Sequence, residues 1–230
     1  MNTKYYILFL GLMLSLVSCE IDNYDEPQAS FTGALTYLGD TIRVAQNDVR
    51  FQLWQSGFGK EGPLDVHVSQ DGSFSSLLFN GDYRLKFIEG QGPFKALSQG
   101  TSQGDTIYLN LSGDTNMELE VMPYYMIRNP EMNLAGASVN ASIDLQQVIT
   151  GEDARDIEHV TLYLNTTRFV SANGDMHVAR ADADLGDMSN LNMTVDIPGE
   201  VVQDYIFARV GVKISGVEDM IYSPLQKLNF

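Results

Sequence analysis

The sequence has little cysteine, little histidine and few positive charges. Its 230 residues include one cysteine and three histidines, and 14 Lys and Arg stand against 30 Asp and Glu, a formal net charge of −16. One cysteine excludes an internal disulfide, so the folded body must be held together by an apolar core. Hydrophobic residues make up 44% of the chain, which is sufficient for such a core. The excess of carboxylates repels phosphate backbones, which makes nucleic acid a poor partner.

Catalytic motifs are also missing. The chain contains no Gly-x-Ser-x-Gly turn, no His-Glu-x-x-His zinc motif, no phosphate-binding loop and no Cys-x-x-Cys pair. His67, His159 and His177 are scattered, and each lies in or beside a stretch of alternating apolar and polar residues. Such positions favour solvent-facing strand residues over catalytic ones. We predict that the protein is not an enzyme and has no cofactor, while a Ser–His–Asp site assembled in space stays open.

One long apolar run is present, near the start of the chain. Lys4 precedes an uncharged run over residues 5–17, which is typical of a secretory signal and short for a membrane-spanning helix of about 20 residues. The run ends in Leu16-Val17-Ser18-Cys19, which resembles the lipobox of bacterial lipoproteins. That resemblance implies removal of residues 1–18 and lipidation of Cys19, so that acyl chains anchor the protein in a lipid bilayer. The alternatives are an ordinary secretory signal with a chance cysteine, and an uncleaved anchor.

An acidic segment follows the cysteine. Residues 19–27 carry four carboxylates, which predicts an extended and solvated tether. The segment also resembles the export signal that directs Bacteroidetes lipoproteins to the outside of the outer membrane. We therefore expect a lipid-anchored outer-membrane protein that faces the cell exterior, and a simple charged spacer is the alternative.

The remaining residues favour an all-β protein of two domains. Apolar and polar residues alternate in several short stretches, and turn sequences such as Asp71-Gly72 separate them. The alternation stops near Pro123 and Pro130, which indicates a domain boundary. The prediction is two β-sandwiches in tandem, at residues 28–122 and 123–230, with a short helical turn within 151–157. The strands are expected over 49–54, 64–68, 83–88, 117–121, 137–145, 160–164, 176–185, 192–197, 205–214 and 222–230.

Two motifs of the first domain resemble a known family of folds. Residues 71–74, Asp-Gly-Ser-Phe, and residues 78–85, Leu-Phe-Asn-Gly-Asp-Tyr-Arg-Leu, are similar to the core pattern of transthyretin-like and carboxypeptidase-regulatory-like sandwiches. The second domain is expected to be immunoglobulin-like or fibronectin-III-like. With the lipobox and the lead-in at 23–27, the whole chain resembles uncharacterised two-domain Bacteroidetes surface lipoproteins associated with Sus-type glycan-uptake loci. The resemblance implies a glycan-uptake context and transfers no catalytic residue.

Aromatic residues are the candidate binding groups. Trp54 and Phe58 lie in or beside an expected loop and could form a platform on which the C–H face of a sugar ring stacks. Trp54 is out of phase with the apolar residues of its strand, which is compatible with exposure and also with packing against the second domain. A core or interface position is favoured over a ligand platform. Tyr124 and Tyr125, at the boundary, are expected to lie between the two domains.

Two further kinds of site are suggested by short patterns. Thr41 and Thr106 each stand in an Asp-Thr-Ile tripeptide, which matches the short pattern that Bacteroidetes O-glycosylate. Asp182, Asp184 and Asp187 could supply oxygen ligands to Ca²⁺. The acidic outer face of an edge strand is the favoured explanation of these residues, and we predict no metal site.

Three functions follow from these observations. We expect a non-catalytic binding or scaffolding module of a glycan-uptake system, with polysaccharide or Sus-type importer subunits as partners. The alternative is an adhesin or structural subunit that assembles by strand addition, in which a terminal strand at 222–230 is displaced. A hydrolase with a spatially assembled site is the third hypothesis.

Overall fold

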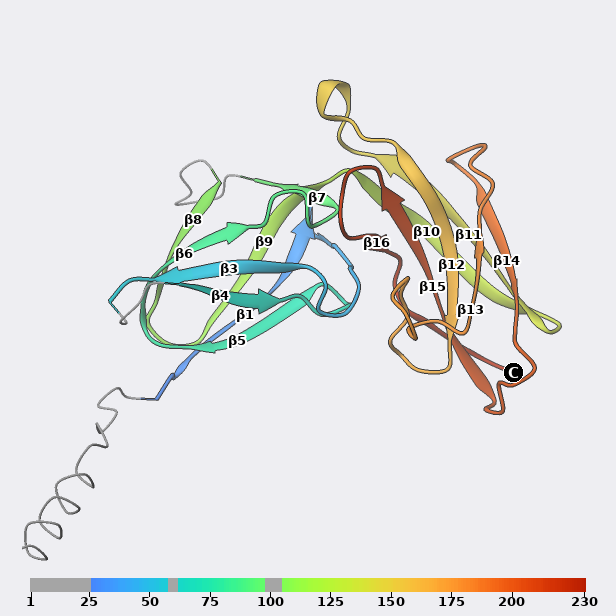
Figure 1. The fold of residues 1–230 in the computed structure, drawn as a ribbon, viewed down its shortest axis with the longest axis horizontal. Coiled ribbons are helices and arrows are strands. Elements are labelled where there is room, and N and C mark those ends of the chain that lie inside the picture. Colours follow the sequence, from blue (N-terminus) through green and yellow to red (C-terminus); the bar gives the residue numbers. More distant parts are fainter. Residues whose placement is uncertain (1–25, 58–61, 98–104) are drawn as a thin grey trace, which may run out of the picture.

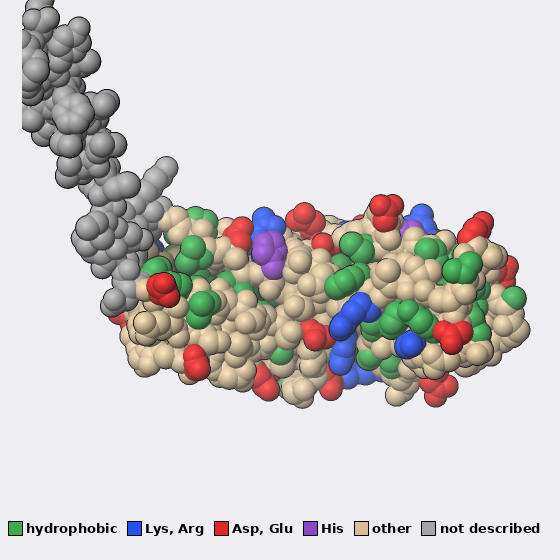
Figure 2. All heavy atoms as spheres, turned by 90° about the horizontal axis from the view of Figure 1, so that it is seen from below, with side chains coloured by type: hydrophobic (Ala, Val, Ile, Leu, Met, Phe, Trp, Pro, Cys, Tyr) green, Lys and Arg blue, Asp and Glu red, His purple; other side chains and the backbone are tan. Residues whose placement is uncertain are grey.

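The computed structural model describes residues 26–57, 62–97 and 105–230, which form two β-sandwiches placed end to end (Figure 1). Within these residues the only helical element is the 3-10 turn η1 (Gly151–Asp153). The prediction of an all-β protein with two domains is confirmed. No helix in the described ranges has the length and apolar character needed to cross a membrane. Acidic side chains are spread over both domains (Figure 2).

The first domain packs two sheets against each other. One sheet has the order β2-β1-β9-β7, and β5 also pairs with β1; the other has the order β4-β3-β6-β8. Strands β1 and β9 run parallel, and every other pair in the two sheets is antiparallel. The strands are β1 (Ala29–Tyr37), β2 (Asp40–Thr41), β3 (Arg50–Gln55), β4 (Pro63–His67), β5 (Ser73–Leu78), β6 (Gly81–Phe87), β7 (Phe94–Ala96), β8 (Thr106–Leu111) and β9 (Thr115–Pro123).

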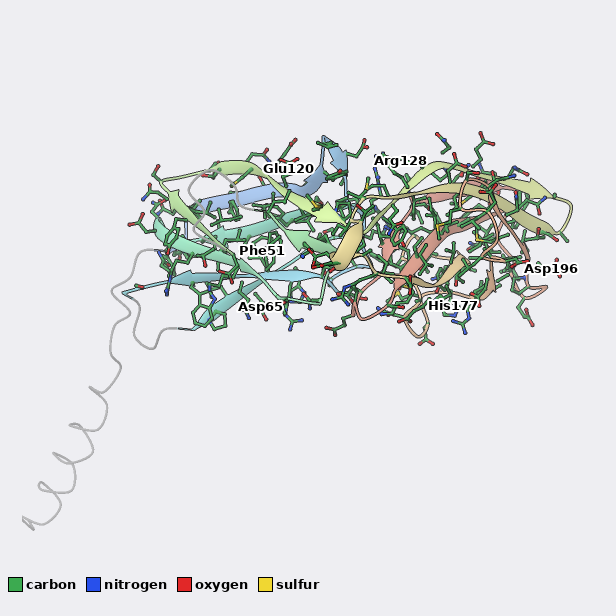
Figure 3. The ribbon with its side chains drawn as sticks, turned by 90° about the horizontal axis from the view of Figure 1, so that it is seen from above. Phe51, Asp65, Glu120, Arg128, His177 and Asp196 are labelled. Atoms are coloured by element: carbon green, nitrogen blue, oxygen red, sulfur yellow. The ribbon has the colours of Figure 1, made fainter. Side chains whose placement is uncertain are left out.

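Aromatic rings fill the space between these sheets. The ring centroid of Phe74 lies 5.1 Å from that of Phe31 and 5.0 Å from that of Phe51, so residues from both sheets meet in one cluster. Figure 3 shows Phe51 between the sheets and Asp65 on the outer side. A Cβ atom on Gly33 would lie 1.8 Å from the carbonyl oxygen of Met117 in β9. Glycine is therefore required at position 33, where β1 passes close to the backbone of β9.

The second domain is also made of two sheets. The first has the order β10-β11-β14, and the second has the order β13-β12-β15-β16, with β17 also paired to β15. The buried residues of the facing strands alternate with exposed ones, as in β14. The strands are β10 (Tyr125–Ala135), β11 (Ser138–Gln147), β12 (Ile157–Asn165), β13 (Ala179–Asp182), β14 (Leu191–Asp196), β15 (Tyr205–Ile214), β16 (Ile221–Tyr222) and β17 (Gln226–Asn229).

Several details differ from the sequence-based expectation. Strands β2, β5, β7, β8 and β10 are not among the expected strands, and β13 is shorter than the expected strand over 176–185. Pro123 and Pro130 do not bracket a linker, because β9 ends at Pro123 and β10 begins at Tyr125. Pro130 lies in a break of the β10–β11 register between Arg128 and Glu131, where the missing N–H costs no ladder hydrogen bond. The expected terminal strand over 222–230 is divided into β16 and β17, which both pair with β15.

A buried arginine of the second domain holds the two domains together. Arg209 in β15 is 1% exposed, and its guanidinium donates to the carbonyl oxygens of Val44 at 3.0 Å and Gln70 at 2.6 Å, both in the first domain. It also donates to the carbonyl of Ser223 at 2.9 Å and lies over the ring of Tyr222 at 4.5 Å. Burial lowers the pKa of Arg209 to about 9, so the side chain stays charged at neutral pH.

Backbone hydrogen bonds cross the same boundary. The Tyr222 N–H donates to the carbonyl of Arg43 at 2.9 Å. The N–H groups of residues 218 and 219 donate to the carbonyls of Gly90 and Gln91, each at 2.9 Å. Main-chain bonds of this kind fix orientation as well as distance, so the two sandwiches form one continuous body.

Candidate functional site

Trp54 lies on the outer face of the β4-β3-β6-β8 sheet. Its neighbours Phe51 and Leu53 are buried between the sheets, and because side chains alternate along a strand, Trp54 points the other way. The indole is half-buried. Its Nε1 atom is buried and has no hydrogen-bond partner among the described residues.

The register of the sheet places two more large side chains beside the indole. Trp54 pairs with Arg84 of β6, and Arg84 pairs with Tyr108 of β8, so the three residues form one row across three strands. Directly paired residues have Cβ atoms about 5 Å apart, close enough for their side chains to touch. Tyr108 is 42% exposed. The row therefore presents two aromatic rings with a guanidinium between them.

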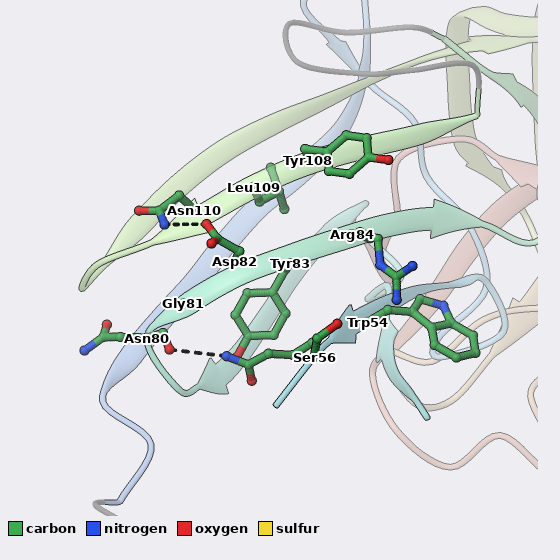
Figure 4. A pocket seen from close by; sticks show the side chains of 11 residues that line it. Trp54, Ser56, Asn80, Gly81, Asp82, Tyr83, Arg84, Tyr108, Leu109 and Asn110 are labelled. Carbon is green, nitrogen blue, oxygen red and sulfur yellow. Dashed lines mark hydrogen bonds between the residues drawn. The ribbon is translucent and has the colours of Figure 1, made fainter. Parts of the chain in front are cut away.

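An open pocket of about 710 Å³ lies over this row (Figure 4). Its far end is polar: the Asn110 amide donates to the Asp82 carboxylate at 2.6 Å, and the Gln55 amide donates to the Asn80 carbonyl at 3.2 Å. Apolar ring surface and hydrogen-bonding groups thus line the same hollow, as in sites for small polar ligands. The lining residues are Trp54, Gln55, Ser56, Asn80, Gly81, Asp82, Tyr83, Arg84, Tyr108, Leu109 and Asn110.

Charges on and beside this face are balanced, although the chain as a whole is strongly acidic. The Arg50 guanidinium lies 3.2 Å from the Asp65 carboxylate, and the Lys86 ammonium lies 3.6 Å from that of Asp105. The Thr106 hydroxyl and then the Lys86 charge lower the pKa of the Asp105 carboxyl. A balanced face in a chain of net charge −16 does not repel an uncharged ligand by long-range electrostatics.

Tyr124 and Tyr125 lie at the junction of the two domains. The Tyr124 N–H donates to the Pro93 carbonyl at 3.1 Å in the first domain, and its own carbonyl accepts from the N–H of Val148 at 2.9 Å in the second. The Arg155 Nε atom donates to the Tyr124 hydroxyl at 3.0 Å, and the Tyr125 hydroxyl donates to the Arg155 carbonyl at 2.8 Å. Both rings are buried, which leaves them no surface to offer a ligand.

The two candidate glycosylation sites differ in exposure. Thr41 is half-buried in β2, whereas Thr106 is 6% exposed and its hydroxyl donates to Asp105 at 3.0 Å. The hydroxyl of Thr106 is therefore shielded in the folded protein, and its glycosylation stays a prediction. The glycosylation of Thr41 stays a prediction.

The structure does not bring the candidate metal ligands together. Asp187 accepts from the N–H and hydroxyl of Ser189, at 2.9 and 2.7 Å, and these bonds lower the pKa of its carboxyl. Asp182 accepts from the hydroxyl of Thr161 in the neighbouring strand. In the described part of the chain, no group of three or more His, Cys, Asp or Glu side chains is arranged to hold a metal ion.

The three histidines are divided between the domains: His67 lies in the first domain, and His159 and His177 lie in the second. The His67 ring forms a 2.8 Å hydrogen bond with the Asn47 carbonyl, and the His177 ring packs 5.4 Å from that of Tyr163. His159 is a half-buried residue of β12. Cys19 and Phe58, the remaining sequence-based candidates, lie outside the described residues.

Sequence reasoning missed Arg84 and Tyr108. Alternation around Tyr83 and Leu85 does place Arg84 on an outer face, but it does not say which strands flank β6. Only the pairing of β3 with β6 and of β6 with β8 shows that these residues face the same hollow as Trp54.

Two family models match the chain. The model described as "Protein of unknown function (DUF3823) N-terminal domain" matches residues 29–122, and the model described as "Domain of unknown function (DUF3823_C)" matches residues 125–227. The two matches meet at the Tyr124 junction. No curated protein sequence matches the chain.

Solved structures show the same fold. A DUF3823 family protein from Parabacteroides merdae is 35% identical, with a TM-score of 0.75 over 89% of this chain and 100% of that one. A DUF3823 family protein from Bacteroides ovatus is 30% identical, with a TM-score of 0.75 over 88% and 99%. A protein from Bacteroides uniformis, proposed to be a carbohydrate-binding protein, is 15% identical, with a TM-score of 0.67 over 89% and 100%.

Proposed function

Because this chain belongs to the DUF3823 family of two-domain proteins, and because one face of its first domain presents Trp54, Arg84 and Tyr108 in a row, we propose that it is a non-catalytic carbohydrate-binding protein. We further propose that lipid on Cys19 holds it at the outer membrane, on the side that faces the exterior. There it would serve a glycan-uptake system, with polysaccharide or importer subunits as partners.

The row of Trp54, Arg84 and Tyr108 is the observation that carries the proposal. The C–H face of a pyranose ring is apolar and stacks on an aromatic ring, while its hydroxyls need donors and acceptors at the edge. Two rings and a guanidinium lie along the floor, and Asp82 and Asn110 stand at one end. This arrangement offers both kinds of contact within one pocket, and its balanced charge suits a neutral sugar.

A relative of the same fold supports the choice of ligand. The Bacteroides uniformis protein is proposed to bind carbohydrate, and it matches this chain along its full length. Its identity of 15% means that its own binding residues cannot be transferred, so the residues proposed for this chain rest on the local geometry alone.

The anchoring proposal rests on the sequence between Lys4 and Cys19. It predicts that radiolabelled palmitate enters the natural protein and that the protein fractionates with the outer membrane. Cys19→Ser should abolish both. Label in the Cys19→Ser variant equal to that in the natural protein would contradict lipidation at this residue.

Binding is tested with the chain from residue 19 onward, carrying Cys19→Ser so that it stays free of lipid. A glycan array identifies a ligand, and calorimetry then measures its affinity. Loss of one stacking ring is worth about 0.5–1.5 kcal/mol beyond the lost contact area, so Trp54→Ala and Tyr108→Ala should each weaken binding about tenfold. Phe169→Ala is the matched control, because Phe169 is a 40% exposed ring in the second domain.

Two outcomes would contradict the proposal. Either no carbohydrate binds the protein, or a carbohydrate binds and both Trp54→Ala and Tyr108→Ala leave its affinity as unchanged as Phe169→Ala does. Circular dichroism of each variant establishes that the fold is retained before affinities are compared.

A further inference from the structure

The candidate pocket lies at the end of the first domain where the chain enters. Ala29 at the start of β1 pairs with Leu78 at the end of β5, and the Ser30 N–H donates to the Asp114 carboxylate in the turn after β8 at 3.2 Å. The polar end of the pocket is built by the turn that follows Leu78 and by the last residues of β3 and β8. The entry of the chain and the pocket therefore share one end of the sandwich.

The second domain lies at the opposite end. Strand β1 runs away from the entry, parallel to β9, and β9 leads directly into the second domain at Tyr124. Figure 1 shows the entry at one side of the first domain and the second domain at the other. The hydrogen bonds of Arg209 hold this arrangement, so the second domain does not fold back over the pocket.

The number of residues between Cys19 and the first domain limits how far the pocket stands from a lipid anchor. Nine peptide units separate Cys19 from Gln28, and a fully extended chain spans at most about 3.6 Å per residue, or about 32 Å in all. A tether of this length keeps the pocket end of the body near the membrane.

Charge orients the rest of the body. Residues 1–18 contain one charged side chain, Lys4, so the processed chain is more acidic than the full sequence. Acidic side chains are spread over both domains on the face drawn in Figure 2, and an anionic membrane surface repels them over about 10 Å. The repulsion favours a body that stands away from the membrane on its tether over one that lies flat.

We propose that the Trp54 face binds polysaccharide segments close to the lipid surface, on the membrane side of the molecule, while the second domain projects outward. This inference rests on the proposed function and on the anchor at Cys19. It adds the position of the bound polysaccharide relative to the membrane. A chain delivered from solution is held next to the membrane, within reach of a membrane-embedded partner. The second domain then serves as the outward part of the body.

The protein supplies its own probes for this arrangement, since it has one tryptophan and one cysteine. The chain from Cys19 onward is coupled through its thiol to a maleimide lipid in vesicles whose headgroups carry an energy-accepting dye. Emission from Trp54 reports the distance between the pocket and the membrane. A second reporter, Trp54→Phe with Phe230→Trp, places the tryptophan at the far end of the second domain, where Phe230 is exposed.

We expect energy transfer from Trp54 to be at least threefold more efficient than transfer from the far reporter. Inserting 20 Gly and Ser residues after Pro27 raises the maximum distance between Cys19 and the first domain by about 72 Å and should lower the transfer from Trp54. Equal transfer from both reporters, or no response to the longer tether, would overturn the orientation. Glycan binding by the free protein is measured separately, so a protein that binds glycan but shows equal transfer contradicts this inference and leaves the proposed function standing.

Discussion

Replacing Arg209 by methionine is expected to destabilise the protein by about 3 kcal/mol. Methionine keeps most of the length of the side chain and removes all of its donors. The carbonyls of Val44, Gln70 and Ser223 each lose a charged donor at 2.6–3.0 Å. A buried acceptor left without a donor costs about 1–3 kcal/mol of stability. The three acceptors together would therefore lower the free energy of unfolding by about 3–9 kcal/mol.

Relief of desolvation reduces that loss. The guanidinium of Arg209 is almost fully buried, and the fall of its pKa to about 9 shows that burial disfavours the charge. Methionine does not carry this penalty, which is several kcal/mol for a buried ion. The expected net change therefore lies at the lower end of the range.

The assay is urea unfolding followed by circular dichroism and by the emission of Trp54, which reports the first domain alone. Arg128→Met is the matched control. Arg128 pairs with Asp40 across the same domain boundary at 2.5 Å, but the two side chains are 33% and 54% exposed, and such pairs contribute about 1 kcal/mol or less. In Arg209→Met we also expect the two signals to separate, because the domains lose the buried hydrogen bonds from Arg209 to Val44 and Gln70 that help to join them. Stability equal to that of the natural protein would show that desolvation of the cation outweighs its hydrogen bonds, and would refute the reasoning.

Two other predictions concern packing and pH. Gly33→Ala should cost about 1–3 kcal/mol in urea unfolding, because the new methyl group would overlap the Met117 carbonyl, whereas Gly186→Ala, which meets no atom within 4 Å, should change little. Equal free energies of unfolding for Gly33→Ala and Gly186→Ala would contradict the close approach of β1 and β9. Burial, and then the carboxylate of Asp48, raise the pKa of Asp219 to about 7. The folded state therefore holds this proton more tightly than the unfolded state does. The resulting contribution to stability is fully present below pH 3.8 and is lost as the pH rises through 7. Asp219→Asn should therefore raise the melting temperature more at pH 8 than at pH 5, and an identical gain at both pH values would contradict this.

Local patterns predicted much of the first domain. The expected turn at Asp71-Gly72 forms: the Asp71 carboxylate accepts from the N–H of Ser73 at 3.1 Å, and Gly72 has a φ of +88°. The inward side chains Phe74 and Tyr83 are buried, as alternation indicates. These features depend on neighbours a few residues apart, and such interactions are visible in a sequence.

Features that depend on distant partners were not predicted. The parallel pairing of β1 with β9 joins residues more than 80 positions apart. The sequence of neither segment indicates which strand it pairs with. Arg209 stands in an apolar strand where a cation is expected to face solvent, yet the first domain covers it and supplies carbonyl acceptors. Pro130 likewise indicates a domain boundary when the sequence is considered alone, because the sequence does not show the irregular register of β10 at this position.

Trp54 shows why a candidate site needs both kinds of information. Its position out of phase with Phe51 and Leu53 indicates an outer face, and that indication fits a domain contact as well as a ligand platform. The structure separates the two, because the first-domain residues that contact the second domain, among them Arg43, Val44 and Gln70, lie at the other end of the first domain. Trp54 lies outside that set of contacts, on an outer face of the sheet in one row with a guanidinium and a second ring. The proposed carbohydrate binding gives this position a role, and the affinity of Trp54→Ala for the ligand tests that proposal directly.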